Sequence, residues 1–440
     1  MSISIIGPGE KMKVHNEDEE IAKEIANETK AGMDVGSLVL ASPTIRKEWK
    51  FLVMSLYRAE ALTVMDSKIG IGGANISSAG TDAFFKLQVG GAKPLKTKVV
   101  TVKGNNRLAI NPIFNYELWF PVSIPSTTQI IKITVLDKDE LSEELIGIFY
   151  EKLGDILRTP NSSLDAKWYN VYGKPEFKND ALASKAVRFA KNAERALENA
   201  VDFNELYNNV PDKGSTFKGR VLCKFRVATK RPTKFDTVEV KPFILKIPKN
   251  VRTPAPPSQS YVLKAFVVVG NMLPNFKDLS ATKLVTSGIT NQDLRVKVTI
   301  GAVELTTKPA KDEDGMCRWN ELLRSEPIQF PRDINQIPDI IVYLVNNANK
   351  PVCFRRIKPG ALNQETGDIE FIGFNKKADW VILQEDKVIN AIDDEDFPGS
   401  LLIKLGFGPK EDSEHSTDEW TKTIKDAKDT ANFQVLQFSQ

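Results

Sequence analysis

Short runs of alternating apolar and polar residues recur along most of this chain, and they constrain its fold more than any other feature. From Trp49 onward the runs are KFLVMSLYRAEAL, AFFKLQV, KTKVVTV, NPIFNYELWF and IIKITVL. Alternation with period two turns one face of each strand toward a core. Strands of this length separated by polar turns predict an all-β fold, built as an antiparallel β-sandwich.

The strand series occurs twice. It restarts at residue 261 and continues to residue 408. In each half a strand led by tryptophan, Trp168 or Trp380, is followed by a closing strand near a glycine, Gly219 or Gly399. The repeated order predicts two related sandwiches in tandem.

The segments around the strands differ in composition. An acidic N-terminal segment has apolar residues at helical spacing, a basic helical pattern interrupts the first strand series, and proline is dense between the two series. We therefore predict short helices at the chain ends and the following organisation: an acidic segment 1–45, a first domain 46–228 with a helical insertion at about 173–215, an extended linker 229–260, a second domain 261–408 and a polar tail 409–440.

Composition narrows the function classes. Lys plus Arg is 60 and Asp plus Glu is 57, a net charge of +3, so we expect no nucleic-acid partner. The three cysteines are too few and too far apart for a disulfide framework or a zinc site. The only two histidines lie in polar terminal segments, so few residues are suited to histidine-based acid–base catalysis. No nucleophile elbow, P-loop or kinase motif occurs, and we expect no enzymatic activity.

The sequence also bears on location. Its N-terminus lacks a basic region followed by an apolar run, and no stretch reaches the ~18 apolar residues that a membrane span needs. We expect a cytoplasmic protein whose membrane contact, if it has one, is peripheral.

One acidic loop carries the main chemical signal. The strand IIKITVL runs directly into Asp137 and Asp139, and Glu144 follows before the next apolar run. Carboxylates gathered in this way repel one another unless a cation joins them. A hard divalent cation that takes six to eight oxygen ligands would relieve this repulsion, so the loop is a candidate site for such an ion.

Together with the order of the upstream motifs, this loop resembles a C2 domain. The motifs that support this resemblance are the acidic residue Asp66, the segment TDAFF with Asp82, and NPIFNYELWF. The resemblance implies an eight-stranded sandwich whose end loops bind calcium and acidic membrane. It also implies the full set of metal ligands: Asp66, Asp82, Asp137, Asp139 and Glu144. The alternative is a solvated, metal-free remnant, since an insertion separates Asp66 from Asp82 and Ala83 replaces a loop proline.

A narrower resemblance is to the ferlins, multi-C2 proteins of membrane fusion and repair. It rests on WKFLVMSLYRAEALTVMD, on WYNVYGKPEF with KGRVLCKFRV, and on IPDIIVYLVNNANKPVCFRRIKPGAL with PGSLLIKLGFGP. The match covers about residues 46–228 and 261–408. It implies a role in membrane trafficking or fusion, in a short form without the transmembrane anchor of that family.

The second domain is expected to be a degenerate C2 domain. It offers Asp278 and Asp293 in its first loop, but its third loop reads Asn346-Asn-Ala-Asn-Lys350. Neutral amides and a lysine do not supply the charge that holds a hard cation. We expect this domain, with the chain ends, to bind protein partners without calcium.

Basic residues of the first domain form a candidate lipid site: Lys86, Lys96, Lys98 and Lys103. On the predicted strand KTKVVTV, Lys96 and Lys98 share one face. The C2 resemblance implies that they hold acidic lipid head groups; the alternative is an ordinary solvated strand.

Two functions remain open. One is a peripheral module that binds acidic phospholipid membrane, with calcium as a regulator. The other is a calcium-independent structural scaffold in a cytoskeletal or ciliary assembly.

Overall fold

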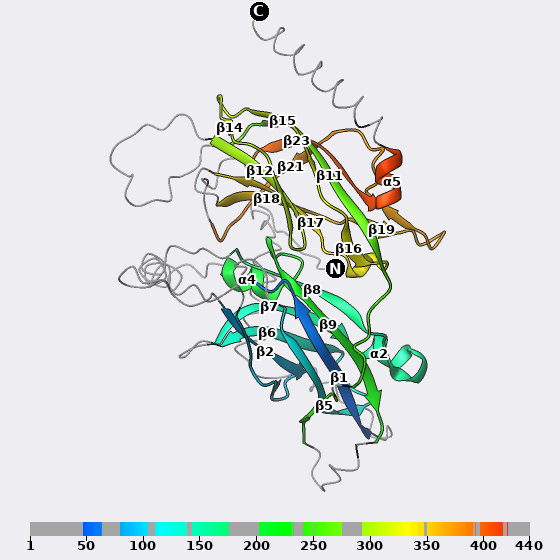
Figure 1. Cartoon of the computed structure of the whole chain (residues 1–440). Helices are drawn as coiled ribbons and strands as arrows, with labels where there is room; N and C mark the ends of the chain where they lie inside the picture. The colour runs from blue at the N-terminus through cyan, green and yellow to red at the C-terminus, as the bar shows by residue number, and fades with distance from the viewer. Residues whose placement is uncertain are drawn as a thin grey trace, which may run out of the picture.

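The computed structural model describes residues 47–63, 80–103, 111–138, 143–175, 202–230, 232, 241–248, 250–274, 293–346, 350–389, 392, 397–416 and 420. Within these ranges β-strands dominate and helices are few and short (Figure 1). The prediction of an all-β fold is confirmed.

The first sandwich consists of two antiparallel sheets. One has the order β10-β5-β1-β9-β8, with strands at Phe243–Lys246, Ile113–Ile124, Glu48–Glu60, Thr216–Ala228 and Lys167–Gly173. The other has the order β3-β2-β6-β7, with strands at Leu95–Lys96, Gly80–Val89, Ile130–Lys138 and Glu143–Lys152, and β4 (Val100–Lys103) also pairs with β2. Alternate residues such as Leu52, Phe85 and Ile133 fill the core between the sheets.

The second sandwich is built in the same way. Its first sheet has the order β15-β11-β23-β21, at Cys317–Arg324, Ser258–Asn271, Ser400–Pro409 and Asp379–Ile382, with β16 (Ile328–Pro331) on β11. Its second sheet has the order β13-β12-β17-β18-β22, at Val303–Thr306, Asp293–Ile300, Ile340–Val345, Pro351–Ile357 and Gln384–Glu385, with β14 (Ala310–Lys311) on β12. A small hairpin, β19 (Gly360–Leu362) with β20 (Ile369–Phe371), extends from it.

The two sandwiches share one strand order. The series β5-β1-β9-β8 corresponds to β15-β11-β23-β21, and β2-β6-β7 corresponds to β12-β17-β18. A backbone detail repeats too: Asn115 in β5 and Asn320 in β15 have φ angles of 51° and 47°, at the points where the pairing with β1 and β11 shifts register. Asparagine tolerates this left-handed conformation better than most residues. The predicted tandem of related sandwiches is therefore observed.

The helices lie at connections: α2 (Leu153–Arg158), α4 (Phe203–Asn209) and α5 (Lys410–His415), with single 3₁₀ turns η2 (Pro160–Ser162) and η4 (Ile334–Gln336). The Asp202 side chain caps α4 by accepting from the Asn204 amide at 2.9 Å. This helix lies within the predicted insertion. The rest of that insertion and the predicted N-terminal helix fall outside the described residues. Among the described helices, none has the length and apolarity to cross a membrane.

Part of the proline-rich segment returns to the first sandwich. Strand β10 pairs with β5, so that Phe243 lies opposite Trp119. Their rings stack with centroids 5.5 Å apart, and Phe51 packs beside both. This segment therefore adds an edge strand to the first sheet.

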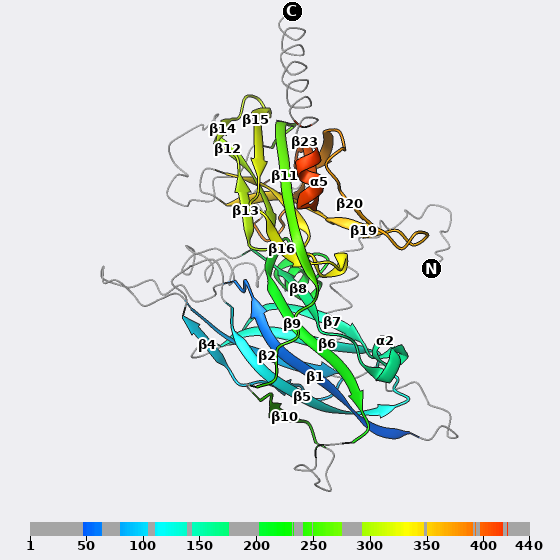
Figure 2. The ribbon, with the colours of Figure 1, turned by 45° about the vertical axis from the view of Figure 1, so that its right-hand side comes forward.

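The two sandwiches lie one above the other in Figure 2, and an apolar cluster packs between them. Tyr172 and Phe217 of the first sandwich pack against Ile341, Tyr343 and Phe354 of the second. The latter three lie on the outer face of β17 and β18, away from the core of their own sandwich. That sheet face is consequently buried between the domains.

Hydrogen bonds surround this cluster. The Tyr343 hydroxyl donates to the Ser215 carbonyl oxygen at 2.7 Å, and the Ser215 hydroxyl donates to Asp386 Oδ2 at 2.6 Å. The Trp168 amide donates to Gln336 Oε1 at 2.9 Å. Because buried polar groups on both sides find partners across the boundary, the interface is specific in orientation.

Candidate functional site

Asp137 lies at the loop end of the first sandwich, directly above the core. Ile131, Ile133 and Val135 of β6 point inward, and the same alternation turns Asp137 inward at the end of the strand. Its side chain is fully buried, and Oδ1 accepts from the Asp82 amide at 2.5 Å. The main chain of β2 thus holds this carboxylate in place.

The other predicted metal ligands are arranged around Asp137 unequally. Glu144 of β7 is its exposed cross-strand partner, so both side chains lie on the same face of the sheet. Ala83 also pairs with Asp137, and alternation therefore turns the neighbouring Asp82 side chain to the opposite face. Asp82 approaches Asp137 through its backbone.

Asp66 and Asp139 fall outside the described residues. Within the described ranges no three His, Cys, Asp or Glu side chains gather closely enough to hold a metal ion. The calcium set of Asp66, Asp82, Asp137, Asp139 and Glu144 stays a prediction.

Two of the four candidate lysines meet on the outer face of β2 and β3. Lys86 and Lys96 are cross-strand partners, and both contact Glu143 at the start of β7. Their ammonium groups lie 2.6 Å and 2.9 Å from its two carboxylate oxygens. Hydrogen bonds from both lysines lower the pKa of Glu143 to about 2. One carboxylate thus bridges two cations.

Lys98 and Lys103 are placed differently. The predicted strand KTKVVTV is broken into β3 and β4, because Thr97 turns inward and exchanges two hydrogen bonds with Phe85. Lys98 follows this turn and is exposed. Lys103 pairs with Gly80 in β4, and its side chain is outside what the structure describes.

Sequence reasoning missed three residues of this face: Glu143, Lys132 and Lys138. Lys132 and Lys138 of β6 point outward with Lys86, because the intervening Ile133 and Val135 face the core. Their alternation within IIKITVLDK is the signal that could have identified them. Glu143 gave no such signal, since the pairing of β3, β2, β6 and β7 in one sheet brings it near the lysines.

The corresponding face of the second sandwich has another composition and another use. Ile341, Tyr343 and Val345 occupy it, and it is buried against the first sandwich. Nearby, Asn346 Oδ1 accepts from the Lys350 amide at 3.0 Å, so this asparagine closes the third loop. Asp293 is exposed, and Asp278 lies outside the described residues.

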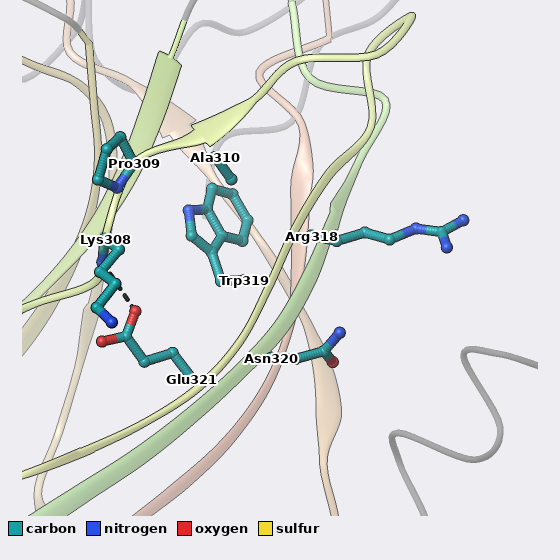
Figure 3. A pocket seen from close by; sticks show the side chains of 7 residues that line it. All are labelled: Lys308, Pro309, Ala310, Arg318, Trp319, Asn320 and Glu321. Atoms are coloured by element: carbon teal, nitrogen blue, oxygen red, sulfur yellow. Dashed lines mark hydrogen bonds between the residues drawn. The ribbon is translucent and has the colours of Figure 1, made fainter.

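A shallow pocket of about 250 Å³ opens at the edge of the second sandwich, between β14 and β15 (Figure 3). Glu321 accepts from the Lys308 amide at 2.8 Å, and Trp319 donates to the Leu294 carbonyl oxygen at 3.1 Å. The lining residues include no histidine, cysteine or serine.

The sequence model of the C2 domain matches residues 50–171, which run from β1 into β8. The chain contains a C2 domain. It corresponds to the first sandwich, and C2 domains as a class bind membrane phospholipids, often under calcium regulation.

Solved structures similar to the chain include C2 proteins. A pair of C2 domains from extended synaptotagmin 2 aligns with 12% identity over 84% of this chain and 94% of that one, with a TM-score of 0.26. The calcium-bound form of the same pair aligns with 11% identity over 81% and 96%, with a TM-score of 0.25. Scores this low carry no argument, so the assignment rests on the matched C2 residues and the strand order. Comparison with curated proteins gave no match.

Proposed function

We propose that this chain is a non-enzymatic, peripheral phospholipid-binding module. Its C2 domain contacts anionic membrane through the outer face of sheet β3-β2-β6-β7. The observation that carries the proposal is the pair Lys86 and Lys96, whose ammonium groups share the Glu143 carboxylate. A lipid phosphate has the charge and the oxygen acceptors to replace that carboxylate.

Electrostatics supports this assignment of the face. Each basic residue near an anionic surface contributes about 1 kcal/mol, so Lys86, Lys96, Lys132 and Lys138 together give useful affinity. On the equivalent face of the second sandwich, Ile341 and Tyr343 of β17 are buried against the first sandwich. We therefore assign lipid binding to the face of the C2 domain.

Calcium regulation is the second part of the proposal. Asp137 near the end of β6 and Glu144 near the start of β7 are cross-strand partners, and Asp66 and Asp139 belong to the same predicted ligand set. Asp82 is the predicted member whose side chain the strand register turns to the other face. At low calcium these carboxylates repel acidic lipid; bound Ca²⁺ cancels that charge and lets the loop end approach. The sequence resemblance supports a ferlin-like role in membrane trafficking or fusion.

Co-sedimentation with vesicles tests the proposal. The full chain should pellet with vesicles rich in phosphatidylserine and phosphoinositide, more so with calcium, and should remain in solution with neutral phosphatidylcholine. The double substitution Lys86→Gln and Lys96→Gln should reduce pelleting. The matched control, Lys297→Gln with Lys308→Gln on the second sandwich, removes equal charge and should leave pelleting unchanged. Equal loss in both double variants would reject the lysine face.

A scaffold role is the second candidate, supported by the buried interface between the sandwiches. An array component benefits from a fixed domain arrangement, and the cluster of Tyr172, Ile341 and Tyr343 supplies one. Fractionation separates the two functions: a scaffold stays with a detergent-insoluble particle after calcium chelation, whereas a lipid-bound module is released by detergent.

A further inference from the structure

The outer face of sheet β15-β11-β23-β21, on the second sandwich, combines an apolar cluster that includes Val262, Phe266 and Val268 with basic side chains. Inward residues such as Leu263, Ile403 and Leu405 belong to the core, and alternation turns their neighbours outward. Among the described residues, the charged side chains that the strand register places on this outer face are all basic: Lys264, Arg318, Arg324 and Lys404.

Both lysines of this set are buried although they lie outside the core. Lys264 is 4% exposed and Lys404 is 1% exposed. Burial, followed by the charges of Arg324 and Lys404, lowers the pKa of Lys264. Burying an ammonium group costs free energy unless the groups that bury it make compensating contacts. The segment that buries these lysines must therefore supply hydrogen-bond acceptors or aromatic ring faces.

The cover is the C-terminal segment of this chain. Lys264 Nζ donates to the Ser413 carbonyl oxygen of α5 at 2.7 Å. The Trp420 ring lies 5.7 Å from Lys264 Nζ and 4.6 Å from Lys404 Nζ, within cation–π range. Trp420 itself is fixed by its Nε1, which donates to the Phe374 carbonyl oxygen at 2.7 Å. One tryptophan thus anchors the segment over both lysines.

The chemistry of this segment shows what the face accepts. Between Lys410 and Trp420 the sequence reads KEDSEHSTDEW, with acidic residues at positions 411, 412, 414, 418 and 419. The segment is acidic in sequence and the lysines that it covers are basic, while the contacts to these lysines come from the Ser413 carbonyl oxygen and the aromatic ring of Trp420. Interfaces that a short segment binds commonly combine complementary charge with an aromatic anchor.

The same face offers apolar contacts beyond the cover. Trp380 and Ile382 on the edge strand β21 are 46% and 55% exposed, and Leu322 on β15 is 45% exposed. Trp380 pairs with the half-buried Leu402, so its ring flanks the covered region. Large exposed apolar side chains beside a basic surface are typical of a protein-binding site.

We propose that this outer face is a binding surface for an acidic segment of a partner protein anchored by an aromatic side chain. In the isolated chain, helix α5 and Trp420 occupy it as an intramolecular ligand. A partner segment of the same chemistry binds by replacing Trp420, and its apparent affinity is reduced by the fraction of molecules in which the face is covered. This proposal is independent of lipid binding by the C2 domain.

A labelled peptide with the sequence of residues 408–422 of this chain is the probe. Fluorescence anisotropy should show that it binds the full-length Trp420→Ala variant about tenfold more tightly than the native chain, because the substitution frees the face. Trp420→Phe keeps an aromatic anchor and disturbs the packing less, and it should give an intermediate affinity. Circular dichroism establishes that each variant is folded.

Peptide and protein controls decide the chemistry. Changing the peptide tryptophan to alanine, or its acidic residues to glutamine and asparagine, should abolish binding. Adding Arg324→Gln to Trp420→Ala should weaken binding. Equal affinity of the native chain and the folded variants for the peptide overturns the proposal. The proposal is also overturned if a variant does not bind the peptide but pellets with anionic vesicles or dimerises in sedimentation velocity. The face would then bind lipid or a second copy of the chain.

Discussion

The guanidinium carbon of Arg356 lies 3.5 Å from the centre of the Tyr172 ring. Arg356 belongs to the second sandwich and Tyr172 to the C2 domain. The same side chain donates to Asp339 Oδ2 and to the Pro211 carbonyl oxygen, each at 2.5 Å. The Asp339 amide in turn donates to the Tyr172 hydroxyl at 2.7 Å. One arginine therefore links both sandwiches to a buried carboxylate.

Replacing Arg356 with alanine should loosen the two domains. The substitution removes the closest cation from the buried carboxylate of Asp339 but leaves Lys358 Nζ 3.1 Å away, so we expect a cost of about 2 kcal/mol. Urea denaturation should show this loss, together with a less cooperative transition. Arg355→Ala is the matched control, since Arg355 is exposed and points away. Equal stability of the two variants would contradict the assigned role of Arg356.

Asp386 should make the interface sensitive to pH. Burial raises its pKa to about 6, although hydrogen bonds from Ser215 and two backbone amides oppose the rise. Between the ordinary carboxyl pKa and this value the folded chain binds more protons than the unfolded chain. Its stability therefore falls as pH rises through this range.

The comparison with Asp386→Asn measures the effect. Relative to that variant, the native chain should lose up to about 3 kcal/mol of unfolding free energy between about pH 4 and pH 7. Denaturation at a series of pH values gives the difference. A difference that does not change with pH would show that Asp386 titrates normally.

Glu143→Gln should strengthen vesicle binding. The substitution removes the carboxylate that Lys86 and Lys96 share, and frees both ammonium groups for lipid phosphate. We expect roughly a fivefold gain in affinity for anionic vesicles. Glu365→Gln, on the exposed hairpin between β19 and β20, serves as the charge-matched control. If both variants gain equally, net charge explains the effect.

The pKa of Glu143 also predicts an acid effect. Because the folded value is about 2, below the ordinary carboxyl value, the bridge stabilises the native chain above about pH 4.5 and loses this effect as pH falls toward 2. Acid titration of the native chain and of Glu143→Gln, followed by circular dichroism, should show a steeper loss in the native chain.

Asn115 and Asn320 should tolerate glycine and resist β-branched residues. Their positive φ angles put a branched side chain under strain, so Asn115→Val and Asn320→Val should each cost about 1–3 kcal/mol. The glycine variants should lie close to the native chain in urea denaturation. A valine variant as stable as the glycine variant would mean that the backbone relaxes at that bulge.

The strand pattern was readable from sequence because each strand obeys period two. Within IIKITVLD the inward set Ile131, Ile133 and Val135 continues to Asp137, so both the core and the position of this carboxylate follow from local alternation. The all-β class and the tandem arrangement follow from the same rule.

Contacts between strands distant in sequence gave no comparable signal. Thr97 breaks a strand that looks regular, because its hydroxyl accepts from the Phe85 amide. The bridge at Glu143 depends on the pairing of β2 with the distant β6 as well as on that of β6 with β7. The apolar residues Ile341 and Tyr343 read as an ordinary buried strand, yet they face another domain. The alternation along a strand shows which of its faces is buried. Which part of the molecule buries that face depends on the tertiary structure.

Strand β10 has a practical consequence for dissecting this protein. A fragment that stops at residue 228 would lack Phe243, which stacks on Trp119, and would leave the edge of β5 that faces away from β1 without a paired strand. Unpaired sheet edges of this kind can pair with strands of other chains and cause aggregation. Expression of the N-terminal half by itself should therefore extend through Ile247, whose amide still bonds to the Asn115 carbonyl oxygen.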